Sequence, residues 1–226
     1  EASLLFFRAT TFYTIGTTLW GYAVLNATYG NVAFINALPT GAILGIILLK
    51  EAITPKKFLA LTISCLGLIL IAIKSVTQSF TVGLGEIMAF LSQIFYSLSY
   101  VIRKKQSNRL NNAESTIIIL GVSSFSLLLL SLLNGEGLPM ISISIIPIIL
   151  IAGLANIIMQ SLITYSFKNQ EVLVASNILN LDTVFGILIA IVLYHEIPTF
   201  RETIGGILIL TSAVYMKIIV SQTQEI

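Results

Sequence analysis

Long stretches of this chain carry no ionised side chain. They separate Arg8 from Lys50, Lys57 from Lys74, Glu86 from Arg103, Glu114 from Glu136, and Glu136 from Lys168. A helix needs about 20 successive apolar residues to cross the hydrocarbon core of a bilayer, and these stretches approach or exceed that length. Only 10% of the 226 residues are charged and the mean hydropathy is +0.97, a composition that a water-soluble domain could not cover with polar surface. We therefore expect an all-α membrane protein with about eight transmembrane helices.

The uncharged stretches divide into eight predicted helices. The stretch after Arg8 holds two helices folded at Asn26–Asn31, and the stretch before Lys168 holds one helix after a loop around Ile141–Pro147. The predicted helices cover residues 10–26, 31–50, 57–74, 86–102, 114–133, 146–167, 172–194 and 203–219. This count leaves no room for a large soluble domain.

The basic residues lie mostly on one side of the predicted bundle. Ten of the twelve Lys and Arg residues fall on that side, namely Arg8, Lys50, Lys56, Lys57, Arg103, Lys104, Lys105, Arg109, Lys168 and Lys217, and two on the other, Lys74 and Arg201. Short basic loops remain in the cytoplasm. Both chain ends and the Arg103–Arg109 loop are therefore predicted to be cytoplasmic.

The segment Asn36–Cys65 recurs at an offset of 145 residues. The matching pairs are Gly41 with Gly186, Leu48 with Leu193, Glu51 with Glu196, Thr54 with Thr199, and Lys56 with Arg201. The loop assignment puts the Glu51 turn inside and the Glu196 turn outside, so the two copies are inverted, as is usual in secondary transporters. Each Glu ends a helix whose dipole opposes a carboxylate, so each is expected to pair with the basic residue that follows it.

Three runs of the first half resemble the first EamA repeat of the drug/metabolite transporter superfamily. They are Phe7–Asn26 with its opening Arg8, Gly30–Pro39 with a central Pro, and Leu48–Thr54 with a Glu at a helix end. The resemblance implies a ten-helix fold of two inverted groups of five. Residues 1–75 then correspond to helices three to five of the first repeat, residues 83–220 to the five helices of the second, and residues 221–226 to a cytoplasmic tail. On this reading the first two helices are absent, and Val184 replaces the central Pro in the second repeat.

The resemblance also implies a function. We expect a secondary transporter that moves a small polar metabolite by alternating access, with the substrate bound at the midplane between the repeats. The start of the chain is most similar to relatives of S-adenosylmethionine uptake carriers. A drug or amino-acid exporter of the same fold, or a non-transporting scaffold or channel, is the alternative. The expected partners are a small-molecule substrate and the lipid bilayer of the bacterial inner membrane, while proton or ion coupling and a homodimer are left open.

Other function classes lack their usual residues. The only histidine, His195, lies at a helix end, Cys65 has no histidine nearby in the sequence, and neither H-E-x-x-H nor G-x-S-x-G occurs. We therefore expect no enzyme, no catalytic residues, no metal site and no cofactor. The net charge of +2 comes from loop residues without a basic stripe that interleaves aromatics, so nucleic acid is not an expected partner.

Polar side chains inside the predicted helices mark either helix contacts or a wet cavity, because a polar group in lipid must find a partner. Several lie at three- or four-residue spacings that share a helix face. Aromatic residues among them could stack on a planar or cationic substrate. The candidate substrate-binding residues are Trp20, Tyr96, Tyr100, Asn156, Gln160, Asn177, Asn180 and Asp182.

Asp182 is the only acidic residue that this helix map places near the middle of the bilayer. Its repeat counterpart is Ala37, so the fold does not require an acid at this position. Asn177 and Asn180 do not share its helix face, so we expect its partner to come from another helix or from the substrate. Either Asp182 binds a cationic substrate or a coupling proton, or it ties two helices together.

Overall fold

The computed structural model describes residues 2–36, 38–76, 83–106, 110–135, 137, 142–195 and 197–224. Their secondary structure consists of α1 (Ala2–Phe7), the π-helix η1 (Arg8–Tyr13), α2 (Thr14–Asn26), α3 (Tyr29–Asn36), α4 (Thr40–Leu49), α5 (Pro55–Val76), α6 (Leu84–Lys105), α7 (Asn112–Leu133), the 3-10 turn η2 (Ile143–Ile145), α8 (Ile146–Asn169), α9 (Val172–Leu179), α10 (Leu181–Tyr194) and α11 (Phe200–Gln224). Ala37, Arg109 and Glu196, and the last two residues of the predicted tail, lie outside the described residues.

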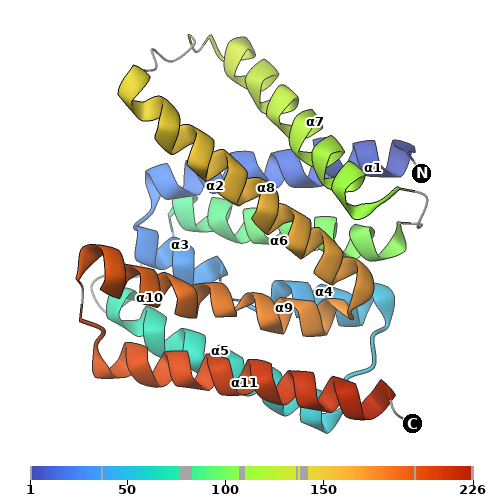
Figure 1. Ribbon diagram of the computed structural model, residues 1–226, viewed down its shortest axis with the longest axis vertical. Helices are drawn as coiled ribbons and strands as arrows, with labels where there is room; N and C mark the ends of the chain where they lie inside the picture. The colour runs from blue at the N-terminus through green and yellow to red at the C-terminus, as the bar shows by residue number, and fades with distance from the viewer. Residues whose placement is uncertain are drawn as a thin grey trace.

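The described helices form the predicted all-α membrane architecture. Five runs are long and apolar enough to cross a bilayer, at Leu84–Lys105, Asn112–Leu133, Ile143–Asn169, Val172–Val192 and Phe200–Ser221. In Figure 1, α7 and α8 lie at one end of the molecule, α2 and α6 lie next to them, and α5 and α11 lie side by side at the other end. Large apolar side chains on α8 are exposed, among them Ile148, Ile151 and Leu154, as expected of a surface that faces lipid.

Two of the predicted helices are broken near their middle. The prediction of a continuous helix over residues 31–50 is wrong, because α3 ends at Asn36 and α4 begins at Thr40. Pro39 explains this break, since proline has no N–H to donate and disfavours a helical conformation in the residue before it. The predicted helix 172–194 forms one spanning run, Val172–Val192, interrupted only by the single residue Asn180, whose backbone stays right-handed helical; Val184 stands where the first repeat has its Pro.

The 145-residue repeat is visible in the backbone. Lys50 after α4 and His195 after α10 are the non-glycine residues with positive φ in the described chain, at 55° and 53°. Their N–H groups bond to the carbonyl oxygens of Gly45 and Ala190, which the same offset relates. The helices that follow, α5 and α11, begin at Pro55 and Phe200, again 145 residues apart.

The helix pair α5 and α11 joins the two repeats. A Cβ added to Gly67 would lie 2.6 Å from the carbonyl oxygen of Gly205, and one added to Gly205 equally close to that of Gly67. One end of the pair is tied by Ser212, whose hydroxyl donates to the Ala60 carbonyl at 2.6 Å. The 145-residue offset relates Ala60 to Gly205 and Gly67 to Ser212, so each of these two contacts is the repeat counterpart of the other. Because 60 lies opposite 212 and 67 opposite 205, the helices are antiparallel and the repeats are inverted.

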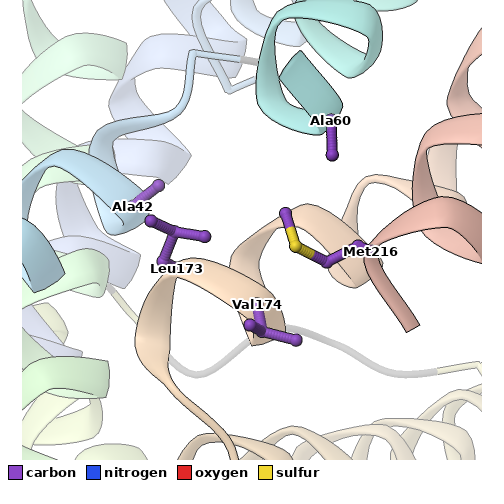
Figure 2. Close-up of a cluster of buried hydrophobic side chains, with 5 residues drawn as sticks. All are labelled: Ala42, Ala60, Leu173, Val174 and Met216. Atoms are coloured by element: carbon purple, nitrogen blue, oxygen red, sulfur yellow. The ribbon is translucent and has the colours of Figure 1, made fainter. Parts of the chain in front are cut away.

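A small apolar cluster joins four helices of the two repeats (Figure 2). Ala42 of α4 and Ala60 of α5 meet Leu173 and Val174 of α9 and Met216 of α11, all buried. Small side chains at such positions let helix backbones approach closely, which supplies much of the packing energy in membranes. This core holds the N-terminal half of α9 beside α4.

Candidate functional site

The polar face of α6 points toward the first repeat. Gln93 donates from Nε2 to the carbonyl oxygen of Asn36 at 3.0 Å, at the end of α3 where Pro39 breaks the helix. Tyr96 donates from its hydroxyl to Oγ1 of Thr17 on α2, also at 3.0 Å. The polar side chains of α6 thus contact both α2 and the broken helix α3/α4, and Gln93 donates to a carbonyl oxygen that the break would otherwise leave unpaired.

A second polar cluster lies where α4, α6 and α9 meet. The hydroxyls of Thr40 on α4 and Ser97 on α6 are 2.9 Å apart. A Cβ added to Gly41 would lie 2.5 Å from Oγ of Ser176 on α9 and 3.7 Å from Oγ of Ser97. The Ser176 hydroxyl is buried without a partner in the described part of the chain. The two repeats therefore meet here through hydroxyl groups rather than apolar side chains.

Two asparagines attach α9 to neighbouring helices. Asn177 is 1% exposed, and its Nδ2 donates at 3.1 Å to the Ser212 hydroxyl of α11, which in turn donates to the Ala60 carbonyl. Asn180, at the break between α9 and α10, donates to Oγ of Ser64 on α5 at 2.9 Å. Both amides are thus engaged by the protein, as polar groups in lipid require.

Asp182 lies in the first turn of α10, directly after the break at Asn180. Its side chain is exposed and accepts a hydrogen bond of 3.2 Å from the Thr183 hydroxyl. The partner seen among the described residues is thus the next residue in the chain.

The remaining candidate residues are spread over the bundle. Tyr100 stacks on Phe167 with ring centroids 4.3 Å apart and an interplanar angle of 13°. Gln160 of α8 is 2% exposed, whereas Asn156, one turn earlier, lies on the exposed stretch of that helix. Trp20 of α2 is 39% exposed. The structure therefore places Asn177 and Asn180 at the break between α9 and α10, turns Tyr96 toward η1 and α2, and leaves Asn156 on the outer surface.

Glu51 does not pair with a following basic residue, so that prediction is wrong. Its two carboxylate oxygens accept the backbone N–H groups of Val172 and Leu173, at 2.7 and 2.9 Å, and so cap the N-terminus of α9. Lys57 instead pairs with Glu171, at 2.5 Å. Helix α4 ends at the left-handed residue Lys50, which turns the chain toward α9. The Glu51 carboxylate therefore lies at the positive N-terminal end of the α9 dipole rather than at the negative C-terminal end of α4.

Sequence reasoning also missed two buried polar groups at helix ends. Asn31 donates to Glu86 at 2.8 Å and ties α3 to the start of α6. Arg8 and Arg103 both donate to the side chain of Gln106. The sequence predicts for Arg8 only that it opens a helix, and no spacing pattern connects Arg8 with residues so distant in the chain. Within the described ranges, no group of three or more His, Cys, Asp and Glu side chains is gathered as a metal ion would require.

The eight helical runs of the described chain, two of them broken, and the inverted repeat define a polytopic α-helical membrane protein of the transporter class. Residues 83–218 match the model of the EamA-like transporter family, more than half of the chain, and the protein belongs to that family. No curated protein matches the sequence.

The fold is shared with a protein of known crystal structure. That structure aligns with a TM-score of 0.79 and 14% sequence identity, covering 94% of this chain and 77% of the other. At this identity the likeness concerns the fold alone.

Proposed function

We propose that this protein is a secondary transporter that moves a small polar metabolite by alternating access, with the substrate bound near the midplane between the repeats. The observation that carries the proposal is the pair of broken helices, α3/α4 and α9/α10. Asn36 at the end of α3 corresponds by the repeat offset to Leu181 at the start of α10. In transporters built from inverted repeats, such breaks offer helix ends and unpaired backbone groups to the substrate.

Unequal packing of the two repeats supports alternating states. At the Glu51 end, α4 packs on α9, with Gly41 against Ser176 and Gly45 against Val172. By the 145-residue offset, α4 corresponds to α10 and α9 corresponds to the start of α3, so an equivalent contact would join α10 to α3. The described residues of α3 instead pack on α5 and α6. We infer that this conformation is closed at the Glu51 end, which the basic loops assign to the cytoplasm, and that exchange of the two packings opens it.

The residues at the α9/α10 break suit a substrate with a positive or amide group. Asp182 offers an exposed carboxylate at the start of α10, and Asn180 a half-buried amide on the residue where α9 ends. Tyr96 lies on α6 against α2, and we propose that its ring joins the site from that side, since an aromatic face attracts cations. We assign these three side chains to the substrate site, and Asn177 to positioning α9 through Ser212.

The experiment that tests the function begins with a search for the substrate. The purified protein is screened for ligand-dependent thermal stabilisation with S-adenosylmethionine, amino acids and purines. The stabilising compound is then used in counterflow with reconstituted vesicles. A carrier shows saturable uptake that unlabelled substrate on the opposite side accelerates. Uptake without acceleration indicates a channel, and stabilisation without uptake indicates a scaffold; either result contradicts the proposal.

Asp182→Asn tests the role of the carboxylate, because it keeps the shape of the side chain and removes its charge. We expect the apparent affinity for a cationic substrate to fall about tenfold, which corresponds to ~1.4 kcal/mol, or the pH dependence of transport to flatten. Glu114→Gln is the matched control, since Glu114 is an exposed carboxylate in the capping box of α7. Unchanged affinity and unchanged pH dependence in Asp182→Asn would show that the residue is structural.

A further inference from the structure

A small pocket lies beside the break between α3 and α4, on the side that faces α5. It has a volume of about 40 Å³ and is open on one side. Pro39 accounts for its position, because α3 ends at Asn36, α4 begins at Thr40, and the chain between them does not continue the regular spacing of helical side chains along α5. The residues that line the pocket are Phe34 of α3, Leu38 and Pro39 of the break, and Cys65, Leu68 and Ile69 of α5.

The walls of this pocket suit an apolar occupant. All of its lining side chains are apolar except the thiol of Cys65, which forms only weak hydrogen bonds. The carbonyl oxygen of Asn36 at the break already accepts a hydrogen bond from Gln93, which lies on α6. A trapped water needs roughly two to four polar partners, and these walls do not supply them. A hydrocarbon group loses no hydrogen bond on entering the same space.

The pocket lies at the depth of the bilayer where lipid chains end. Cys65 is the eleventh of the 22 residues of α5, so about 15 Å of helix separates it from either end. The hydrocarbon core is about 30 Å thick, which places the pocket near its midplane. Ile69 lines the pocket and is also exposed, as is Leu66 one turn away, so the pocket borders an apolar surface of the kind that faces lipid. The groups available at this surface and depth are the ends of acyl chains.

We propose that this pocket binds the end of a lipid acyl chain. One water needs ~10–15 Å³ of such space, so the pocket holds about two or three methylene or methyl groups. Filling it restores the dispersion contacts that the lining side chains of an empty pocket lose. The headgroup of the same lipid stays at the membrane surface, because the pocket offers it no charged side chain. The site is independent of the proposed transport function.

Photoreactive lipids test the site directly. The protein is reconstituted into phosphatidylcholine vesicles that contain a phosphatidylcholine with a diazirine either at the last carbon of one acyl chain or next to the glycerol. After illumination, tandem mass spectrometry identifies the labelled residues. We expect the terminal diazirine to label Leu38 about threefold more strongly than the diazirine near the glycerol, because the two differ in depth. Equal labelling of Leu38 by both lipids, or labelling of the exposed Leu66 without Leu38, would overturn the proposal.

Cys65→Leu distinguishes the pocket from the outer surface of α5, because the larger side chain occupies the space of the chain end. We expect the labelling of Leu38 by the terminal diazirine to fall about threefold, as steric exclusion requires, while Leu66 is labelled as in the wild type. Cys65→Ala is the matched control, since it removes the thiol, enlarges the pocket and should keep the labelling of Leu38. Cys65→Val, which adds less volume, takes the place of Cys65→Leu if that variant does not fold. Unchanged labelling of Leu38 in the filled variant, or an equal loss at Leu66, would refute the site.

Discussion

Two adjacent glycines of α11 have different surroundings. A Cβ at Gly205 would lie 2.6 Å from the Gly67 carbonyl oxygen, whereas one at Gly206 would meet nothing within 4 Å. We expect Gly205→Ala to destabilise the protein by about 1–3 kcal/mol through overpacking. Gly206→Ala should be neutral or stabilising by up to ~1 kcal/mol, because alanine is the better helix former. Thermal unfolding of both variants checks this, and equal midpoints would contradict the close approach of α5 and α11.

Residue identity and spacing predicted which side chains are polar on which helix face, but not their partners. The four-residue spacing of Tyr96 and Tyr100, for example, predicts that both lie on one face of α6. The bonds of Glu51 to α9 were not predicted, because the partners lie 121 and 122 residues away. A contact between elements so distant in sequence depends on tertiary packing, which periodicity does not encode.

At the scale of elements, the cap that Glu51 places on α9 is expected to stabilise the closed packing. Glu51→Gln removes the charge and one of the two acceptor oxygens, so we expect a loss of about 1 kcal/mol. Amide hydrogen exchange at Val172 and Leu173 should accelerate, because their N–H groups lose an acceptor.

The neighbouring carboxylate provides the control for this prediction. Glu171 is 42% exposed and pairs with Lys57, so Glu171→Gln should cost at most about 1 kcal/mol and leave the exchange of Leu173 unchanged. Equal exchange rates at Val172 and Leu173 in Glu51→Gln and in the wild type would show that the cap does not hold α9.

The sequence predicted where the helices lie better than it predicted where they are interrupted. The uncharged stretches predicted the spans, and α5, α7 and α8 lie within a few residues of their predicted ranges. The break between α3 and α4 has a local cause in Pro39, which the prediction of a single helix over 31–50 did not take into account. The break at Asn180 has no proline, and the hydrogen bond of Asn180 to Ser64 on another helix accompanies it. The sequence therefore contains a local cause for the break between α3 and α4, whereas it contains none for the interruption at Asn180.

At the scale of the whole molecule, the basic loops predict the orientation in the membrane. Ala113 near the start of α7 should face the cytoplasm, and Ile197, which is 92% exposed between α10 and α11, should face the opposite side. In a Cys65→Ala background, a single cysteine at each position should react with an impermeant thiol reagent from opposite faces of the membrane. Labelling of both from the outside would refute the orientation and the inverted repeat.

The repeat symmetry also predicts a contact that belongs to the other state of the carrier. Gly45 and Val172 lie in the closed contact between α4 and α9, where a Cβ on Gly45 would be 3.0 Å from that of Val172. The 145-residue offset maps these two positions onto Ala190 and Ala27. Ala27 instead packs against Gly85 of α6, since a Cβ there would lie 2.7 Å from its own. Ala27 and Ala190 are thus expected to meet only when the packing of the repeats is exchanged.

Paired cysteines in the Cys65→Ala background test this exchange. Gly45→Cys/Val172→Cys should crosslink in the conformation described here. Ala27→Cys/Ala190→Cys should crosslink in only a fraction of the molecules, and the transported substrate should change that fraction, because a ligand shifts the populations of states that bind it differently. Either crosslink should abolish counterflow, and reduction should restore it. Ala27→Cys/Val172→Cys, which joins one position from each pair, is the control and should form no crosslink. If Ala27→Cys/Ala190→Cys never crosslinks, with or without substrate, the two repeats do not exchange their packing and the alternating-access proposal fails.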